Sequence, residues 1–429
     1  MFRRLLVAVA TLVFSTALFA QSAPSDVEQR LRALEEKVAA MQKAAPTVDF
    51  SEIQREIDVL SKEIETLKTH QQQPAVEATV PQHGLGAAAS KVYRAEQGVS
   101  FGGYGEFLYN NPEHGAATAD ALRAILYTGY KFNDRVLFNS ELEVEHASTE
   151  HSGEVSLEFG YLDFLNRPAA NIRAGLVIVP MGIINEQHEP TSYLGANRPQ
   201  TERFIIPSTW SEIGAGVFGE SGAFSYRGFV MTGLNSSEFT GDEGIREGRQ
   251  GGSESIAEDL AVVGRLDWHP MEGAIIGGSL YSGGSGQTAA FKGRVTLAEV
   301  HGDAKFRGLS LRALAARAHI GDAGAISAAN GDTIGSAMGG WYAEAGYDLA
   351  SILSRSFSIT PYARYERIDT NRRVASSFTR NRENDRRITT LGVAFKPIAQ
   401  TVIKTGWQQV KRANGTSDSE FNVALGYIF

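Results

Sequence analysis

The sequence contains no cysteine in 429 residues. That absence excludes disulfide bonds, thiolate metal sites and cysteine nucleophiles. The nine histidines and the many serines form no recognisable motif of a nucleophile with a positioned base. We therefore predict that the protein is not an enzyme and needs no cofactor or metal. A hydrolase such as a lipase or protease is the enzymatic alternative.

The chain also lacks a long apolar run and an excess of positive charge. Outside the N-terminus, no stretch approaches the ~20 apolar residues of a membrane-spanning helix. The formal net charge is -8, which argues against nucleic acid as a partner. The mean hydropathy of -0.19 does not separate a soluble protein from a membrane wall built of strands, because half of each such strand faces water.

The N-terminus predicts a signal peptide over residues 1–22. Arg3 and Arg4 form a basic start, and residues 5–19 are largely apolar. Several small residues near the end of this run offer cleavage sites that the sequence does not rank. An exported chain without cysteine is compatible with the periplasm or outer membrane of a Gram-negative cell.

Residues 25–70 have the heptad pattern of an α-helical coiled coil. Apolar residues recur at spacings of four and three in two blocks, 27–41 and 53–67, with charged residues on the flanks. The blocks are out of phase and Pro46 lies between them, so we expect a break or kink there. A single amphipathic helix packed on a domain is the alternative. The pattern leaves dimer and trimer open.

A linker is predicted over residues 71–98, which show no sustained period. From residue 99 the apolar period is two, and the 45 glycines, 22 phenylalanines and 14 tyrosines fit strands, tight turns and interfacial aromatics. We predict about sixteen strands, each long enough to cross a membrane at a tilt; fourteen or eighteen are also compatible. Their ranges are 99–109, 121–132, 135–146, 154–165, 171–179, 211–219, 223–232, 259–268, 273–282, 293–306, 309–320, 336–349, 356–367, 386–396, 400–411 and 419–429.

The connections between these strands alternate between short turns and long loops. Short turns on one rim and long loops on the other are typical of outer-membrane barrels, and a soluble sandwich or propeller gives no reason for this bias. An even strand count returns both chain ends to the periplasmic rim. The predicted fold is therefore all-β: a transmembrane antiparallel β-barrel over residues 99–429, preceded by an α-helical coiled coil in the periplasm.

The last strand alternates strictly and ends the chain on an aromatic residue. Phe421, Val423, Leu425, Tyr427 and Phe429 share one face, while small or polar residues occupy the other. Such a strand fits a wall between lipid and water. The ending resembles the C-terminal signature of bacterial outer-membrane barrels, so we predict that Tyr427 and Phe429 serve as an assembly signal.

Charged residues alternate with apolar ones in several strands and must face a wet interior. Lysine or arginine on the lipid side costs about 2–4 kcal/mol at the bilayer midplane. A barrel of about sixteen strands encloses an aqueous channel, and mixed charges give no ring of one sign. For any single residue, a solvated wall position or an internal ion pair is the alternative. The predicted pore-lining residues are Arg123, Glu141, Glu143, Glu145, Arg173, Arg227, Arg265, Glu299, Lys305, Arg364 and Lys404.

The long third loop, residues 180–210, is the predicted constriction. It holds four prolines and several charges, which favour an ordered loop. An exposed surface loop is the alternative. His188 lies between two carboxylates, but a lone histidine without further ligands does not predict a metal site. The candidate constriction residues are Glu186, His188, Glu189, Arg198, Glu202 and Arg203.

A family resemblance rests on this region. The strand 172–179 running into Pro180-Met181-Gly182, the Arg198-Pro199 stretch and residues 206–210 resemble the phosphate-selective porin O and P family over roughly residues 95–429. The resemblance implies a sixteen-stranded, usually trimeric outer-membrane pore with an inward-folded third loop. Phosphate-selective members carry a ladder of lysines and arginines in the pore. Glutamates among the predicted lumen residues depart from that ladder, which puts phosphate specificity in doubt.

Two outer loops differ in charge. Residues 368–387 contain six arginines against three acidic residues, whereas residues 238–259 are mostly acidic. The basic loop is predicted to attract anions or to bind the phosphates of lipopolysaccharide, with ordinary solvated charge as the alternative.

Together these features predict a homotrimeric outer-membrane porin in contact with lipid and lipopolysaccharide. It would pass small hydrophilic solutes or ions by diffusion, anions such as phosphate among them. The alternative is a structural envelope tether, in which the barrel anchors a periplasmic coiled coil.

Overall fold

The chain divides into two compact units, residues 1–74 and residues 75–429. The computed structural model describes residues 81–149, 153–353 and 356–429, all in the second unit. The predicted signal peptide, coiled coil and first part of the linker lie outside the described residues. No helix in the described ranges is long and apolar enough to cross a membrane.

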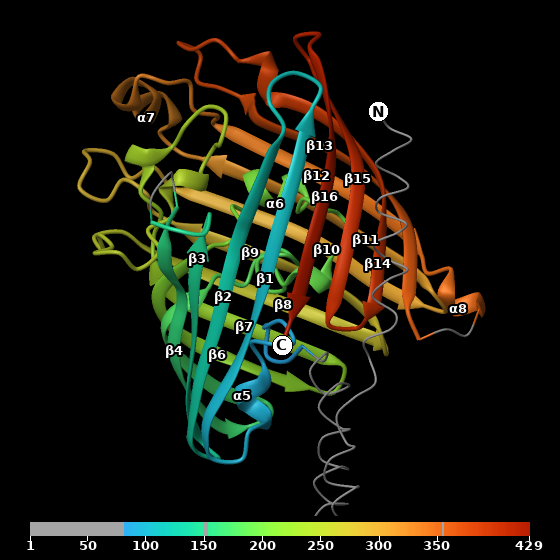
Figure 1. Cartoon of the computed structure of the whole chain (residues 1–429). Helices are drawn as coiled ribbons and strands as arrows, with labels where there is room; N and C mark the ends of the chain where they lie inside the picture. Colours follow the sequence, from blue (N-terminus) through green and yellow to red (C-terminus); the bar gives the residue numbers. More distant parts are fainter. Residues whose placement is uncertain (1–80, 150–152, 354–355) are drawn as a thin grey trace, which may run out of the picture. The chain divides into compact units, whose positions relative to one another are not determined.

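Sixteen antiparallel strands form one closed barrel (Figure 1). Each strand pairs with its neighbours in sequence, and β1 pairs with β16 to close the barrel. The predicted strand number and the approximate position of every strand are confirmed. The strands are β1 (Gly98–Pro112), β2 (Thr118–Asn133), β3 (Val136–Glu145), β4 (Val155–Arg167), β5 (Ala170–Ile178), β6 (Ser211–Ser221), β7 (Phe224–Thr232), β8 (Leu260–Met271), β9 (Ala274–Gly283), β10 (Val295–Phe306), β11 (Leu309–Ile320), β12 (Ala337–Tyr347), β13 (Ser358–Arg373), β14 (Asp385–Ile398), β15 (Thr401–Arg412) and β16 (Ser417–Ile428).

The two rims of the barrel differ as predicted. Most connections on one rim are tight turns, such as residues 134–135 and 307–308, although residues 348–357 carry the short helix α8 (Ala350–Leu353). The other rim carries the long loops. The first residue of β1 and the last residue of β16 both lie on the short-turn rim. The loops on the long-loop rim hold six further short helices: η2 (Pro190–Ser192), α6 (Gln200–Phe204), η3 (Ser236–Glu238), η4 (Arg246–Gly248), α7 (Ala323–Asn330) and η5 (Arg382–Asn384).

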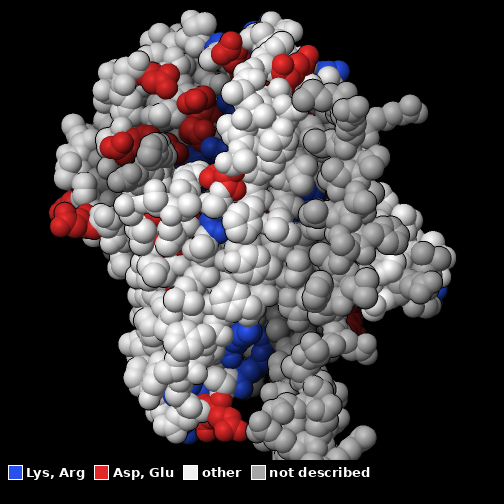
Figure 2. Space-filling model, viewed as in Figure 1, with Lys and Arg blue, Asp and Glu red and all other residues white. Residues whose placement is uncertain are grey.

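The period of two places apolar side chains on the outer face and polar ones inside. In β15, Trp407 is exposed on the outer face, while Lys404 and Gln408 are buried in the interior. The predicted faces of β3, β13 and β15 agree with this arrangement. In the view of Figure 2 the wall is mostly uncharged around its middle, and charged residues gather toward its ends. The wall therefore presents an apolar band to its surroundings, as a lipid-facing barrel does.

The predicted cationic loop, residues 368–387, is shorter than expected. Strand β13 continues to Arg373 and β14 begins at Asp385, so only residues 374–384 connect them. Arg380 pairs with Asp369 and Asp385, which neutralises part of the charge. The period-two pattern is weak in this polar stretch, which explains why the sequence placed the strand ends too early.

The described part of the predicted linker is no simple connector. Residues 82–95 turn at Gln82–Leu85 and form the helix α5 (Lys91–Arg94). Leu85, Ala88 and Val92 are almost completely buried. We call residues 82–95 the plug segment, because they pack inside the short-turn end of the barrel.

The C-terminal aromatic residues close the seam between β1 and β16. The backbone N–H of Phe429 donates to Gly103 at 2.9 Å, and the Gly103 N–H donates back at 3.1 Å. A Cβ on Gly103 would lie 2.7 Å from the Phe429 ring, and one on Gly105 would lie 2.5 Å from the Tyr427 hydroxyl. The two rings thus cover backbone that only glycine leaves accessible.

Removing Phe429 should impair assembly of the barrel. The deletion loses two backbone hydrogen bonds, worth about 0.5–1.5 kcal/mol each, and uncovers Gly103. The yield of folded barrel can be measured by its heat-modifiable mobility in gels. Phe429→Tyr keeps the ring and both bonds, so it should fold like the parent chain. Normal insertion of the deletion variant would rule out the assembly role but not the barrel.

Candidate functional site

Loop L3, defined here as residues 179–210 between β5 and β6, folds into the barrel. Most of its residues are buried, and it contains η2 and α6. The predicted inward course of this loop is therefore observed, and the alternative of an exposed surface loop is wrong. The contacts that hold L3 in place determine where a passage remains inside the barrel.

Glu186 attaches L3 to one wall of the barrel. Its carboxylate lies 3.0 Å from Nε of Arg227 on β7 and 3.3 Å from Nη1 of Arg265 on β8. Arg265 also donates to the carbonyl oxygen of Gly182 in L3. Two buried guanidinium groups therefore share one carboxylate from the loop, a geometry that satisfies charges removed from water.

Glu202 connects two parts of L3 and attaches the loop to β12. Its carboxylate accepts the N–H groups of Ile183 and Ile184 at 2.8 and 2.7 Å, and the Tyr342 hydroxyl of β12 at 2.6 Å. Burial raises the pKa of Glu202, although the hydrogen bonds from Tyr342 and Ile184 act in the other direction. Nearby, the Thr201 N–H donates to Glu366 of β13 at 2.9 Å.

His188 and Glu189 fix the tip of L3. The ring of His188 lies 3.2 Å from the carboxylate of Glu141 on β3, and its other nitrogen lies 3.0 Å from the Asn185 carbonyl, so neither neighbouring glutamate is its partner. Glu189 accepts the N–H groups of Ala88 and Ala89 in the plug segment at 2.8 and 3.2 Å. Burial raises the pKa of Glu189, again against those hydrogen bonds.

The two arginines predicted for the constriction lie differently. Arg198 stays inside and donates to the carbonyl oxygen of His188 at 3.3 Å. Arg203 is 49% exposed and lies 3.6 Å from Glu243 of another loop. The structure thus places Arg203 at the long-loop side of L3, away from the other five residues, because the opposite face of α6 packs against the wall.

All of the predicted pore-lining residues face the interior. Most are paired with neighbouring charges and form a network of mixed sign, as the sequence indicated. Lys305 lies beside a cavity, and the Lys404 ammonium lies 3.4 Å above the ring of Tyr193 in L3. The paired residues are Arg123 with Glu143 and Glu145, Arg173 with Asp163, Arg227 and Arg265 with Glu186, Glu141 with His188, Glu299 with His301, and Arg364 with Glu344 and Glu366.

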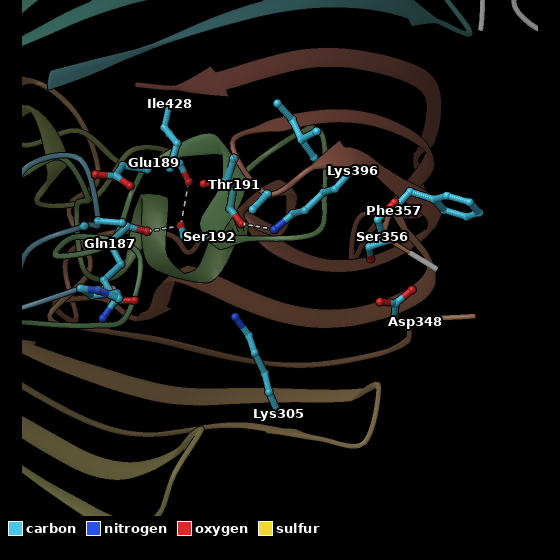
Figure 3. A pocket seen from close by; sticks show the side chains of 16 residues that line it. Gln187, Glu189, Thr191, Ser192, Lys305, Asp348, Ser356, Phe357, Lys396 and Ile428 are labelled. Atoms are coloured by element: carbon cyan, nitrogen blue, oxygen red, sulfur yellow. Dashed lines mark hydrogen bonds between the residues drawn. The ribbon is translucent and has the colours of Figure 1, made fainter. Parts of the chain in front are cut away.

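Cavities remain on both sides of L3. At the short-turn end, two adjoining cavities of about 540 and 320 Å³ lie against β10–β14, and Thr191 and Ser192 of L3 line both. Figure 3 shows Lys305 and Lys396 pointing into this space, where Lys396 donates to the Thr191 carbonyl at 2.7 Å. At the long-loop end, a cavity of about 400 Å³ is lined by Gln200 of L3 and by strands β14–β16. L3 therefore separates the two ends of the interior.

Polar atoms without protein partners gather between these cavities. Thr390 Oγ1, Lys404 Nζ, Gln408 Oε1 and Asn422 Oδ1 are buried, and none has a hydrogen-bond partner among the described residues. They lie on β14, β15 and β16, where Thr390 pairs with Gln408 and Asn422 lies opposite Gly406. A buried polar group left unpaired costs about 1–3 kcal/mol. This wall therefore suits water or a polar solute.

A second loop folds over the long-loop end. In loop L4, residues 233–259, the Gly241 carbonyl accepts the side chains of Thr370, Asn371 and Asn384 across the barrel mouth. Arg249 donates to the Thr209 carbonyl of L3 at 2.5 Å. Arg246 donates to the Ser208 carbonyl, and burial lowers its pKa to about 9. L4 thus holds L3 from outside and narrows the mouth.

Solved structures similar to this one are outer-membrane barrels. OmpF of Salmonella typhi in complex with daunomycin has a TM-score of 0.53 at 11% identity, covering 78% of this chain and 98% of that one. A loop-deletion mutant of OmpT, an outer membrane protein of Vibrio cholerae, has a TM-score of 0.51 at 12% identity, covering 78% and 100%. A trimer form of the same OmpT has a TM-score of 0.50 at 12% identity. At such identities the likeness shows the fold.

A protein similar in sequence to this chain shows the family to which the chain belongs. An uncharacterized protein of Aquifex aeolicus (strain VF5) is 33% identical over 370 residues, which are 82% of this chain and 85% of the relative. The chain belongs to the family of this Aquifex protein. No family model matches the chain.

Two parts of the site were not predicted from the sequence. The plug segment looked like a linker, because its glycines and alanines show no period. The inward course of L4 left no signal beyond its charge. Tyr193 and Tyr342 were also missed as contacts of L3, although the alternation of β12 could have placed Tyr342 inside.

Replacing Glu186 by alanine should weaken the attachment of L3 to the barrel wall and lower the stability of the protein. The change leaves the guanidinium groups of Arg227 and Arg265 without their shared carboxylate, and breaking a buried pair costs about 3–5 kcal/mol. Thermal unfolding in detergent should show the loss. Glu272→Ala, at an exposed turn, is the matched control and should stay within about 0.5 kcal/mol. Equal stability of the two variants would contradict the role of Glu186 in holding L3 against the wall.

Proposed function

We propose that the protein is an outer-membrane porin, a passive diffusion channel for small hydrophilic solutes or ions. The observation that carries this proposal is the row of unpartnered polar atoms on β14–β16, between a cavity on each side of L3. A passage along this wall supplies these atoms with water or solute. The fold shared with outer-membrane barrels supports the location.

The narrowest part of the proposed route lies beside Lys404. The long-loop cavity is lined by Ile388, Gln408 and Glu420, and the short-turn cavity by Lys396 and Ile428. Between these levels, the same three strands present Thr390, Lys404 and Asn422, with Tyr193 of L3 facing them. A solute would therefore pass between one ammonium group and a few neutral polar groups.

The route favours anions. Lys305 and Lys396 point into the short-turn cavity, and Lys404 forms no ion pair with another described residue. Asp348 and Glu189 are the acidic residues that line the same cavity. Positive charge in a narrow, low-dielectric passage raises the local concentration of anions. Phosphate is one such anion, and its selection over chloride is part of the proposal that the conductance experiment tests.

We further propose that the pore works as a homotrimer in the Gram-negative outer membrane, with the short-turn rim in the periplasm. The trimer form of the similar OmpT barrel supports the assembly. The heptads of residues 25–70 would then lie on the periplasmic side and hold the subunits together. Cross-linking of the purified protein tests the subunit number.

Conductance of the purified protein in a planar lipid bilayer tests the channel directly. We expect stepwise conductance and a reversal potential of anion-preferring sign in a potassium chloride gradient. Added phosphate should reduce the chloride current if it shares the route. Absence of stepwise conductance in a correctly folded sample would refute the porin proposal.

Charge reversal of the cavity lysines should change the ion preference. The double variant Lys305→Glu with Lys396→Glu replaces two positive charges by two negative ones, so the reversal potential should shift toward cation preference. Lys292→Glu is the matched control, because Lys292 is 78% exposed in its side chain and lies on an outer loop. A shift of equal size in both variants would contradict the route.

A further inference from the structure

We infer that the plug segment, residues 82–95, sets the ion preference of the channel. It fills one half of the short-turn end and confines solutes to the half that carries Lys305 and Lys396. This inference rests on the proposed porin function.

The plug segment packs against the strands on one side of the barrel. Val92 contacts Gly129 of β2, where a Cβ would lie 2.7 Å from the Val92 Cβ. Asn139 of β3 donates to the Ala89 carbonyl at 3.0 Å. Tyr93 donates to Asp163 of β4 at 2.6 Å and accepts from Arg173 of β5 at 2.8 Å. These contacts run from β2 to β5, so this half of the interior is closed.

The remaining space lies on the other side of the plug segment. Gly86 and Ala87 form one wall of the short-turn cavity, and its other walls come from L3 and from β10, β13, β14 and β16. The plug segment is therefore a partition: one side faces packed wall strands and the other faces the cavity.

The half that the plug segment covers holds charges that are already paired. Asp163 accepts from Tyr93, whereas Glu189, which accepts from Ala88 and Ala89, lies at the edge of the open cavity. A Cβ on Gly84 would lie 2.7 Å from Oε1 of Glu186. Arg173 and Arg227 also lie in this half, but each is already paired with one of these carboxylates.

Close packing explains the composition of the segment. A Cβ on Gly86 would lie 2.4 Å from the carboxyl group of Glu189, and Gly84 has φ +77°. Neither position accepts a larger residue without displacing a carboxylate of L3. Lys91 and Arg94 in α5 add positive charge to the partition itself. These two cations favour anions in the open half.

Replacing residues 82–95 by a glycine and serine stretch of equal length in the full chain tests the inference. We expect a larger single-channel conductance and a reversal potential shifted toward cations, because ions can then also pass away from Lys305 and Lys396. Unchanged conductance and reversal potential would overturn the inference. Absence of conductance in the parent chain would instead refute the porin function.

A second variant loosens the segment without replacing it. Tyr93→Phe with Asn139→Ala removes the hydrogen bonds to Asp163 and to the Ala89 carbonyl while keeping every strand and every charge. It should shift the reversal potential in the same direction by a smaller amount. This variant decides the question if the replaced chain does not assemble, and an unchanged potential would count against the inference.

A disulfide tests whether the segment stays seated during conduction. The chain has no cysteine of its own, so Val92→Cys with Gly129→Cys gives a single pair. Its Cβ atoms need a shift of about 1 Å to reach the usual separation of a disulfide. The oxidised pair should conduct with the parent's conductance and ion preference, as should the control Val92→Cys alone. A block that a reductant relieves would show that conduction requires the segment to leave, and would overturn its role as a fixed partition.

Discussion

The structure depends on the pairing of charges that L3 and the plug segment bring into the barrel. An ionised group removed from water costs several kcal/mol unless charged or hydrogen-bonding partners surround it. Glu186 meets two guanidinium groups, Glu202 meets three donors, and Glu189 meets two backbone N–H groups. Each carboxylate finds its donors at one position in the barrel. L3 therefore has one position, and the passage beside it has a fixed shape.

The structure of the wall is explained by a second free-energy cost, that of exposing charged groups and unpaired backbone N–H and C=O groups to lipid. The strands carry their charges inward, and closure between β1 and β16 leaves no free edge. At that seam Tyr427 and Phe429 cover Gly103 and Gly105. The same alternation that makes the wall apolar outside makes the interior polar, so a pore lining is a consequence of the wall itself.

The sequence predicted the features that rest on local pattern. Strand positions, their faces and the inward-facing charges follow from a period of two and from the cost of charge in lipid. The order of L3 followed from its prolines. The partners of Glu186 or His188 did not, because Arg227 and Glu141 are distant in sequence and their approach depends on barrel register. The plug segment was missed for the opposite reason: the small residues that allow Gly86 to approach Glu189 also remove every periodic signal.

A barrel that served only as an anchor for a periplasmic segment would need no polar wall left unpaired. Here the interior is divided unequally. On the side of β2–β8, Arg173, Arg227 and Arg265 are paired with carboxylates, and the plug segment and L3 fill the short-turn end, while a cavity of about 540 Å³ remains at the long-loop end beside β3–β5. On the side of β14–β16, Lys404 and its polar neighbours have no such partners, and cavities lie above and below them. Because unpaired buried groups are costly, the four on β14–β16, which belong to no ion pair among the described residues and lie between cavities, favour a hydrated route over a filled anchor.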